Sequence, residues 1–187
     1  GSVVVNAGGT LSGNTAVGGN LTVNAGGTLA SGNSPGTTTV AGNFTGGGIL
    51  SVEVQFSNAG APGTTHDFLN ITGNVTGVST INVLAVAPST PAALTTGNGI
   101  ELVRVGGTTS ASAFALSGPV VQGGVQYLLN YLADYSGTLD GYFLQSTARD
   151  EIPGYAAMLA SGRTLLARCH RGEERNSAQG AVDGGKR

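Results

Sequence analysis

The side chains that could carry out chemistry are few in this sequence and occur mainly as neighbouring pairs. His66-Asp67 places an imidazole beside a carboxylate, the combination found in catalytic dyads. Adjacent residues of a strand point to opposite faces, so we predict that this pair has a structural role at a turn or strand entry. Asp150-Glu151 offers two carboxylates, as glycoside hydrolysis requires. Because this pair is directly followed by a turn at Pro153-Gly154, we interpret it as surface charge at a junction.

Two further patterns have a chemical and a structural interpretation. Cys169 is the single cysteine, and its neighbour His170 is the nearest base in sequence. Nothing else in the sequence supports a dyad, so we interpret Cys169 as a free, unreactive thiol in a polar tail. The glycosylation pattern Asn-x-Thr begins at Asn20, Asn43, Asn70 and Asn74. We interpret it as a by-product of a repeated turn and strand.

The sequence contains no phosphate-binding loop, zinc-protease helix, nucleophile elbow or calcium loop. We therefore predict no enzyme activity, no metal and no cofactor. Residues 1–52 carry no charge, residues 53–162 carry a net charge of −5, and residues 163–187 carry +3. A mildly acidic body lacks the clustered basic face that nucleic acid requires, so we predict no nucleic-acid partner.

Two short phrases recur along the chain and indicate a repeated structural unit. VNAGGTL occupies residues 5–11 and again residues 23–29, at an offset of 18. The phrase apolar-x-Gly-Asn-apolar-Thr occupies residues 17–22, 40–45 and 71–76. Repeats at about this period are typical of stacked architectures in which each unit packs on the next.

The segments between these turns have the composition of short strands. β-branched or alternating apolar residues occur at 3–5, 21–23, 38–40, 49–56, 81–86, 100–105, 126–131 and 142–145. We also expect a long strand-turn over 66–75 and a turn within 136–141, a segment with two turn signals that include the hairpin pair Asp140-Gly141. On the strand 100–105 we expect one solvent-exposed face, which carries Glu101 and could include Arg104.

These observations predict an all-β fold, a right-handed parallel β-helix (solenoid). With a coil of about 18–23 residues, Asn6 lies directly above Asn24 and their amides bond along the axis. All five tyrosines lie within 127–155, so we expect the denser and more stable core in the C-terminal half. There we expect a β-hairpin-rich cap, followed by a short helical or disordered tail. The domain prediction is repeat coils at 1–60, a C-terminal cap at 61–150 and a linker at 151–187.

Several motifs resemble the C-terminal part of bacterial autotransporter (type V secretion) passengers. Residues 66–75 resemble that family's D-x-L-x-V-x-G strand-turn, 97–105 resemble its next strand, and 114–116 resemble its F-x-L step. Residues 127–129 and 142–144 resemble its paired closing strands. The more specific motifs are 149–155, similar to the R-P-E-V-P-x-Y junction, and 168–180, similar to the run that leads into the barrel. Asp150 stands where the family often has Pro.

This resemblance implies a structural fragment of a secreted or surface-displayed passenger. The cap would be the autochaperone or junction region, which folds first outside the outer membrane and templates the remaining coils. The implied partners are upstream passenger coils and the protein's own C-terminal β-barrel, which would begin where this chain stops. The positions that we expect to matter for this folding role are Phe68, Leu69, Ile71, Gly73, Leu102, Val103, Tyr127, Leu129, Tyr142 and Leu144.

Two other functions are open at this level. The Thr-rich face formed by Thr10, Thr22, Thr28 and residues 37–39 could bind a host surface protein or glycan, as an adhesin does. A polysaccharide-active β-helix enzyme is disfavoured, since it needs acids clustered on one face and residues 1–52 have none. The N-terminal edge of the stack would be uncapped, which predicts self-association there.

Overall fold

The computed structural model describes residues 1–32, 35–56, 61–86 and 92–148. These residues belong to one unit, 1–148, and their regular secondary structure is entirely β-strand, as the all-β prediction required. Within these ranges no helix is long and apolar enough to cross a membrane. The predicted helical or disordered tail and the pairs Asp150-Glu151 and Cys169-His170 lie outside the described residues.

The strands form three sheets. The first has the order β1 (Val3–Val5), β4 (Leu21–Val23), β7 (Phe44–Gly46) and β10 (Val75–Gly77). The second has the order β13 (Phe114–Leu116), β11 (Ser79–Ala85), β8 (Ile49–Val54), β5 (Thr28–Ser31) and β2 (Thr10–Gly13). The third has the order β14 (Val120–Gln122), β15 (Val125–Leu132), β16 (Asp140–Ala148), β12 (Ile100–Val105), β9 (Phe68–Ile71), β6 (Thr37–Val40) and β3 (Ala16–Val17).

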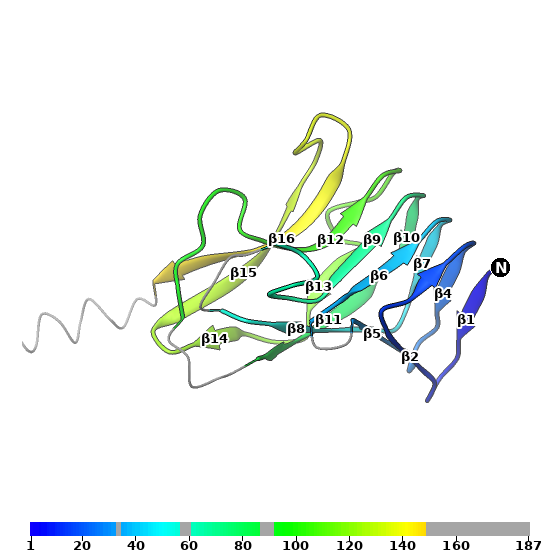
Figure 1. Ribbon diagram of the computed structural model, residues 1–187, viewed down its shortest axis with the longest axis horizontal. Coiled ribbons are helices and arrows are strands. Elements are labelled where there is room, and N and C mark those ends of the chain that lie inside the picture. The colour runs from blue at the N-terminus through cyan, green and yellow to red at the C-terminus, as the bar shows by residue number, and fades with distance from the viewer. Residues whose placement is uncertain (33–34, 57–60, 87–91, 149–187) are drawn as a thin grey trace, which may run out of the picture. The chain divides into compact units, whose positions relative to one another are not determined.

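From β1 to β12, successive strands belong to the first, second and third sheet in turn (Figure 1). Each time the chain returns to a sheet, it adds the next strand at the side of the previous one. Neighbours within a sheet are therefore three places apart in sequence, and they pair parallel, as β1 with β4 and β6 with β9 do. This arrangement is β-helix-like. The expected strand-turn at 66–75 corresponds to β9, which ends at Ile71, and to the turn before β10, which begins at Val75 in a different sheet.

The register explains the repeated phrases and corrects the expected coil length. Val5 pairs with Val23, so the first coil advances by 18 residues and the two VNAGGTL phrases lie on one another. Asn24 Nδ2 donates to Asn6 Oδ1 at 2.9 Å, which confirms the predicted stacking of these amides. The later coils are longer than the predicted range, since Phe44 pairs with Val75, 31 residues on.

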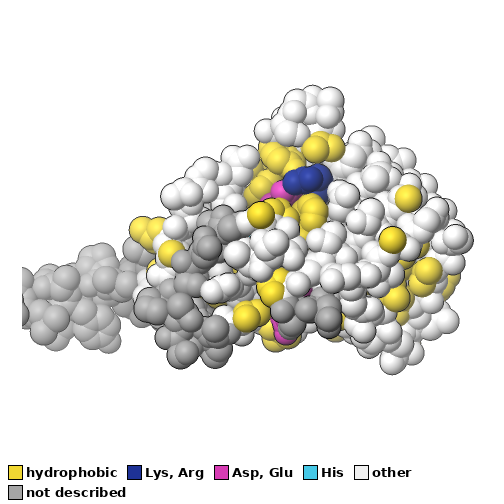
Figure 2. All heavy atoms as spheres, in the orientation of Figure 1, with side chains coloured by type: hydrophobic (Ala, Val, Ile, Leu, Met, Phe, Trp, Pro, Cys, Tyr) yellow, Lys and Arg dark blue, Asp and Glu magenta, His cyan; other side chains and the backbone are white. Residues whose placement is uncertain are grey.

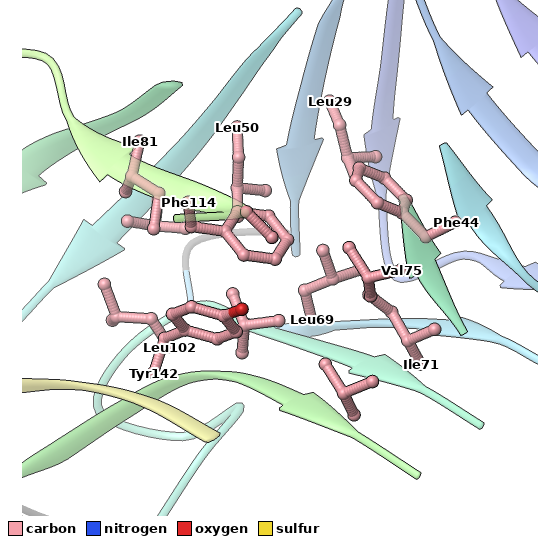
Figure 3. Packing of buried hydrophobic residues seen from close by; sticks show 14 of the residues in the cluster. Leu29, Phe44, Leu50, Leu69, Ile71, Val75, Ile81, Leu102, Phe114 and Tyr142 are labelled. Carbon is pink, nitrogen blue, oxygen red and sulfur yellow. The ribbon is translucent and has the colours of Figure 1, made fainter. Parts of the chain in front are cut away.

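Alternate residues of each strand point inward and fill the space between the sheets. Leu29, Leu50 and Ile81 are in register on the second sheet and at most 1% exposed. On the third sheet, Leu69 pairs with Val103, and both are fully buried. Figure 3 shows such side chains converging from separate strands on one core. Stacking thus buries a continuous apolar column that no single coil could bury alone.

The C-terminal strands change the pairing from parallel to antiparallel. β16 pairs antiparallel with β12 on one side and with β15 on the other, and β14 adds to β15. The turn between β15 and β16 lies partly in the predicted segment 136–141, since it includes Gly137, but Asp140-Gly141 does not form it, because both residues already belong to β16. The chain instead reverses at Asp134, whose φ is 49°, and the N–H of Gly137 donates to its carbonyl at 2.9 Å. Asp140 Oδ1 accepts a hydrogen bond from the N–H of Asp134, so this carboxylate stabilises the turn although Asp140 itself belongs to β16.

The strand β12 is covered on both faces, which corrects the expected solvent-exposed face. Glu101 is only 8% exposed, and both Leu102 and Val103 are buried. The pairing with β16 shifts register between Glu101 and Val103, a β-bulge that breaks the strict alternation of inward and outward residues. The sequence pattern alone did not show that a hairpin would cover this strand.

Candidate functional site

The most distinctive feature of the C-terminal end is a column of aromatic rings that runs from the coils into the hairpin. Phe44 of β7 stacks on Phe114 of β13, with ring centroids 5.8 Å apart. The rings of Phe114 and Tyr142 meet edge to face with centroids 4.7 Å apart (Figure 3). The ring of Tyr142 also lies 5.3 Å from that of Tyr131 in β15. Such pairs add to the stabilisation from buried area, so the column joins all three sheets at this end.

Tyr142 lies at the centre of this column and its hydroxyl is satisfied by the loop between β12 and β13. The ring is fully buried, and Tyr142 Oη donates to the carbonyl of Ser110 at 2.5 Å. Thr109 Oγ1 lies 2.8 Å from the same oxygen. Burial raises the pKa of Tyr142, so the hydroxyl keeps its proton and remains a donor. The same loop covers β10, since the N–H of Val75 donates to the carbonyl of Thr108.

The positions expected to matter for folding lie mostly in this core. Eight of them are at most 6% exposed: Phe68, Leu69, Ile71, Leu102, Val103, Tyr127, Tyr142 and Leu144. Leu129 is only partly buried and packs against the margin of the core. Tyr127 lies 4.5 Å from the ring of Phe56, and its hydroxyl donates to the carbonyl of Ala93. Burial describes where these side chains lie, and their role in folding remains a prediction.

A charged cluster that sequence reasoning missed covers the outer face of β12. Arg104 donates from Nε and Nη2 to the two carboxylate oxygens of Glu101, at 2.9 and 2.6 Å. Arg104 Nε also lies 2.9 Å from the Tyr135 hydroxyl, which itself donates to Glu101. The hydrogen bond to Glu101 is the largest cause that raises the pKa of Arg104, and burial raises the pKa of Tyr135 to about 12.

Aromatic rings support this cluster from both sides. The guanidinium of Arg104 lies 5.0 Å from the ring centroid of Phe68, a cation–π distance, and Tyr135 meets Phe143 edge-on at 4.9 Å. In Figure 2 the basic side chain lies against acidic and hydrophobic side chains, and further acidic atoms are visible lower on the same face. The cluster therefore ties the tip of the hairpin, which carries Tyr135, to strands β9 and β12.

His66 and Asp67 form a second polar link, between successive coils. His66 is 1% exposed, and its Nε2 lies 2.9 Å from the carbonyl of Glu101. Asp67 accepts the N–H of Gly36 at 2.8 Å and of Glu53 at 2.9 Å. The two side chains bond to different coils, which agrees with the structural role predicted for the pair. Burial lowers the pKa of His66 and raises that of Asp67, so each group favours its neutral form.

The lowered pKa of His66 predicts a pH dependence of stability. The unfolded chain binds a proton at His66 near the ordinary histidine pKa of about 6.5, whereas the folded chain binds it only at lower pH, because burial lowers the pKa of His66. Stability from neutral His66 is therefore complete above 6.5 and is lost as the pH falls through the lowered, folded-state pKa. We expect the free energy of unfolding to fall more in the native chain than in His66→Gln between about pH 7 and pH 5.

Denaturant unfolding of both chains at several pH values measures this difference. The pH dependence that Asp67 contributes has the opposite sign, because its raised pKa lowers the free energy of unfolding as the pH rises above 3.8. Asp67 is present in both chains, so its contribution cancels in the comparison. Parallel pH profiles for the native chain and His66→Gln would contradict the prediction.

The Gly-Asn phrases stack into a third feature, which we call the Gly-Asn column. Its steps are Gly1-Ser2, Gly19-Asn20, Gly42-Asn43, Gly73-Asn74 and Gly107-Thr108. The N–H of Asn43 donates to Asn20 Oδ1, that of Asn74 to Asn43 Oδ1, and that of Thr108 to Asn74 Oδ1, at 2.8–2.9 Å. At the first step the N–H of Asn20 donates to Ser2 Oγ at 3.1 Å. The repetition of the phrase was visible in the sequence, but this bonding scheme was not.

The column explains the glycine expected at position 73, for a reason other than turn geometry. A Cβ on Gly73 would lie 2.5 Å from the carbonyl oxygen of Gly42 and 2.7 Å from Asn43 Oδ1. These are atoms of the neighbouring coil, so only glycine allows the two coils to approach. The φ of Gly73 is not in the left-handed region that would itself require glycine.

We expect Gly73→Ala to lower the free energy of unfolding by about 1–3 kcal/mol, because the new methyl group forces two stacked backbones apart. Gly118→Ala is the matched control, since a Cβ there meets nothing within 4 Å and its φ is not positive. That control should stay within about 0.5 kcal/mol of the native chain. Urea midpoints of the three chains give the comparison, and equal losses for the two variants would contradict it.

The described residues offer little for other chemistry. Among them no three His, Cys, Asp or Glu side chains gather as a metal site. The threonines proposed as one adhesive face are divided among the three sheets: Thr22 is in β4, Thr10 and Thr28 are in β2 and β5, and Thr37–Val40 form β6. Thr38 points inward and is fully buried. These residues therefore do not form a single face.

Comparison with known proteins agrees with this geometry. The sequence model of the family described as Autochaperone Domain Type 1 matches residues 19–129, from the Gly-Asn column before β4 into β15. No curated protein matches the chain. The match covers more than half of the sequence and includes the coils from β4 onward, two rings of the aromatic column, Phe44 and Phe114, and the loop over β10. The chain therefore belongs to the autochaperone domain type 1 family and contains the autochaperone region of an autotransporter passenger.

Proposed function

We propose that the antiparallel strands β14 to β16 cap a right-handed parallel β-helix and that this capped end nucleates its folding. Family membership gives the chain a role in autotransporter passenger folding and secretion, in association with the passenger and its C-terminal barrel, at the cell surface or in secreted form. The right-handed solenoid is supported by the order of the three sheets, because crossovers between parallel strands are almost always right-handed. We propose no catalytic role.

The observation that carries the proposal is the position of Tyr142. It comes from the antiparallel strand β16, yet its ring is fully buried against Phe114 of the parallel stack. Solenoid coils contact mainly their neighbours, so folding can begin at the most stable unit and propagate from there. The end that contains the aromatic column and the partly buried ion pair between Arg104 and Glu101 is therefore the part of the stack that we propose as the folding nucleus.

The two ends of the stack differ in a way that fits this role. At the N-terminal end, β1, β2 and β3 each pair with one neighbour in their sheet. At the other end, β16 covers β12 and the loop after β12 bonds to Val75 of β10, while β13 and β14 are the edge strands of their sheets. An uncovered strand edge accepts further strands, whereas a covered edge stops addition. In the third sheet, the hairpin strands therefore stop addition at β12.

Two matched core truncations test the proposal. Leu144 in β16 and Leu21 in β4 are both fully buried, so Leu144→Ala and Leu21→Ala remove the same groups at opposite ends. If the capped end forms in the folding transition state, Leu144→Ala should slow refolding by about tenfold. Leu21→Ala should leave the refolding rate almost unchanged and speed unfolding instead.

Stopped-flow refolding and unfolding in denaturant measure both rates for each variant. The proposal fails if Leu21→Ala slows refolding as much as Leu144→Ala does. It also fails if both variants act only on the unfolding rate.

A further inference from the structure

The charged cluster on β12 and the polar link at His66 share one residue, Glu101. The carboxylate of Glu101 accepts hydrogen bonds from Arg104 and from the hydroxyl of Tyr135, at the tip of the hairpin. Its main-chain carbonyl lies 2.9 Å from His66 Nε2. A carbonyl oxygen can only accept, so Nε2 carries the proton and donates it, and Nδ1 accepts from the hydroxyl of Thr65, 3.1 Å away. Glu101 thus connects the hairpin to the turn between β8 and β9.

Asp67 continues this path into the preceding coil. Its Oδ2 accepts the N–H of Glu53 in β8, and its Oδ1 accepts the N–H of Gly36, directly before β6. The carbonyl of Gly36 in turn accepts the N–H of Phe68, the first residue of β9. A series of hydrogen bonds, joined by the peptide link between His66 and Asp67, therefore runs from the hairpin through β12 and the β8–β9 turn to the start of β6.

Both side chains at the centre of this path are buried, with 1% exposure for His66 and 3% for Asp67. A buried polar group without its partner costs more free energy than an exposed one, because water cannot replace the missing bond. The corresponding link one coil earlier is exposed: there the N–H of Thr37 donates to Asn14 Oδ1 at 2.7 Å. Neighbouring coils are therefore coupled more strongly at the β8–β9 turn than at the turn of Asn14.

Two glycines make room for Asp67 in the coil that it reaches. A Cβ built on Gly32 would overlap both Asp67 Oδ1 and the main-chain nitrogen of Gly36. Gly32 also has a φ of 91°, which disfavours other residues there. The carboxylate thus lies in a space that Gly32 leaves open, and it contacts the coil of β6 at the point where this strand begins.

We propose that His66 is a positioning residue of the folding pathway, which passes the order of the capped end to the coil that contains β6. The carbonyl of Glu101, fixed by the pairing of β12 with β16, binds His66 and orders the β8–β9 turn. Asp67 is then held where its carboxylate accepts the N–H of Gly36, so that β6 begins in register with β9. This proposal rests on the folding function proposed above and adds the residues that carry direction from one coil to the next.

Pulsed hydrogen exchange during refolding of the full chain, read by NMR, gives the order in which segments become protected. The amides paired between β15 and β16 report the hairpin, and the N–H groups of Gly36 and β6 report the coil to be joined. Three variants are compared with the native chain. His66→Leu removes the donor to Glu101, His66→Gln retains a side-chain N–H donor, and Ile71→Val removes one buried methyl group from β9.

In the native chain we expect the hairpin amides to become protected before those of β6. In His66→Leu the hairpin should keep its native rate, while Gly36 and β6 become protected about tenfold later, the kinetic effect of one buried carbonyl left without its donor. His66→Gln should restore most of the native interval between the two segments. Ile71→Val should leave this interval unchanged, because it alters packing without breaking the hydrogen-bond path.

The outcomes distinguish the role of His66 from the proposed function. If β6 is protected before or together with the hairpin in the native chain, both are overturned. If the hairpin forms first, the role of His66 alone is overturned by an unchanged interval in His66→Leu, by an equal delay in Ile71→Val, or by a His66→Gln chain that behaves like His66→Leu. Loss of protection in both segments of His66→Leu also overturns it, since the hairpin forms before His66 is needed. Protection of the hairpin alone in that variant supports it.

Discussion

Tyr142→Ala is expected to lower the free energy of unfolding by about 3–5 kcal/mol, the loss typical of deleting a large buried aromatic ring. The ring is fully buried and contacts both Phe114 and Tyr131, so its removal leaves a cavity where the parallel coils meet the hairpin. The hydroxyl bond to the carbonyl of Ser110 is lost as well. A domain with the usual margin of about 5–15 kcal/mol would then be close to unfolding.

Two control variants distinguish the stability contributed by the buried ring from that of the hydroxyl group and from that of an exposed hydrophobic side chain in the hairpin. Tyr142→Phe keeps the ring and should cost about 1 kcal/mol for the lost hydrogen bonds. Leu128→Ala removes a neighbouring hydrophobic side chain that is 48% exposed, and it should cost far less than Tyr142→Ala. Denaturant unfolding followed by circular dichroism gives all three values. A loss below about 1 kcal/mol for Tyr142→Ala would show that the column does not join the two parts of the fold.

Arg104→Ala is expected to cost about 2–3 kcal/mol, because it leaves the carboxylate of Glu101 without its cationic partner. Losses of about 3–5 kcal/mol are typical when one member of a fully buried pair is removed. The expected loss is smaller here because the side chain of Arg104 keeps 34% of its exposure, against 10% for Glu101. Tyr135 still donates a hydrogen bond to Glu101 in this variant.

A double-mutant cycle distinguishes the stability lost with the ion pair from the stability lost with packing. Glu101→Gln combined with Arg104→Ala removes the unpaired charge, so the double variant should be more stable than Arg104→Ala alone. Arg104→Met retains much of the contact with the ring of Phe68 and shows how much of the loss is packing. If the double variant loses the sum of the two single losses, the two side chains are not coupled and the charged cluster does not tie the hairpin down.

Much of the fold could be predicted from the sequence because its coils repeat a local rule. The strands at 3–5 and 21–23 were predicted at the bounds observed, and the Asn6–Asn24 bond was predicted from the 18-residue offset alone. Glycine or asparagine directly follows several strands, among them β1, β3, β4, β5 and β12, and alternating apolar residues specify which face points inward. These signals involve residues close in sequence, so they can be read without knowing which segments meet.

The interactions at the capped end were decided by the tertiary structure. The partners of Glu101 are Arg104, three residues away, and Tyr135, which follows in a separate hairpin, and the bulge that buries Glu101 exists only because β16 pairs with β12. Asp140-Gly141 has the composition of a hairpin turn, yet its pairing with β12 and β15 places it in a strand. Asn43 depends both on a local sequence pattern and on a tertiary contact. Its place after glycine is a repeated local pattern, while its acceptor role needs the coil of Asn74 stacked on it. Local backbone preference and periodicity are properties of the chain, whereas burial and pairing are properties of segments brought together, and only the folded molecule contains them.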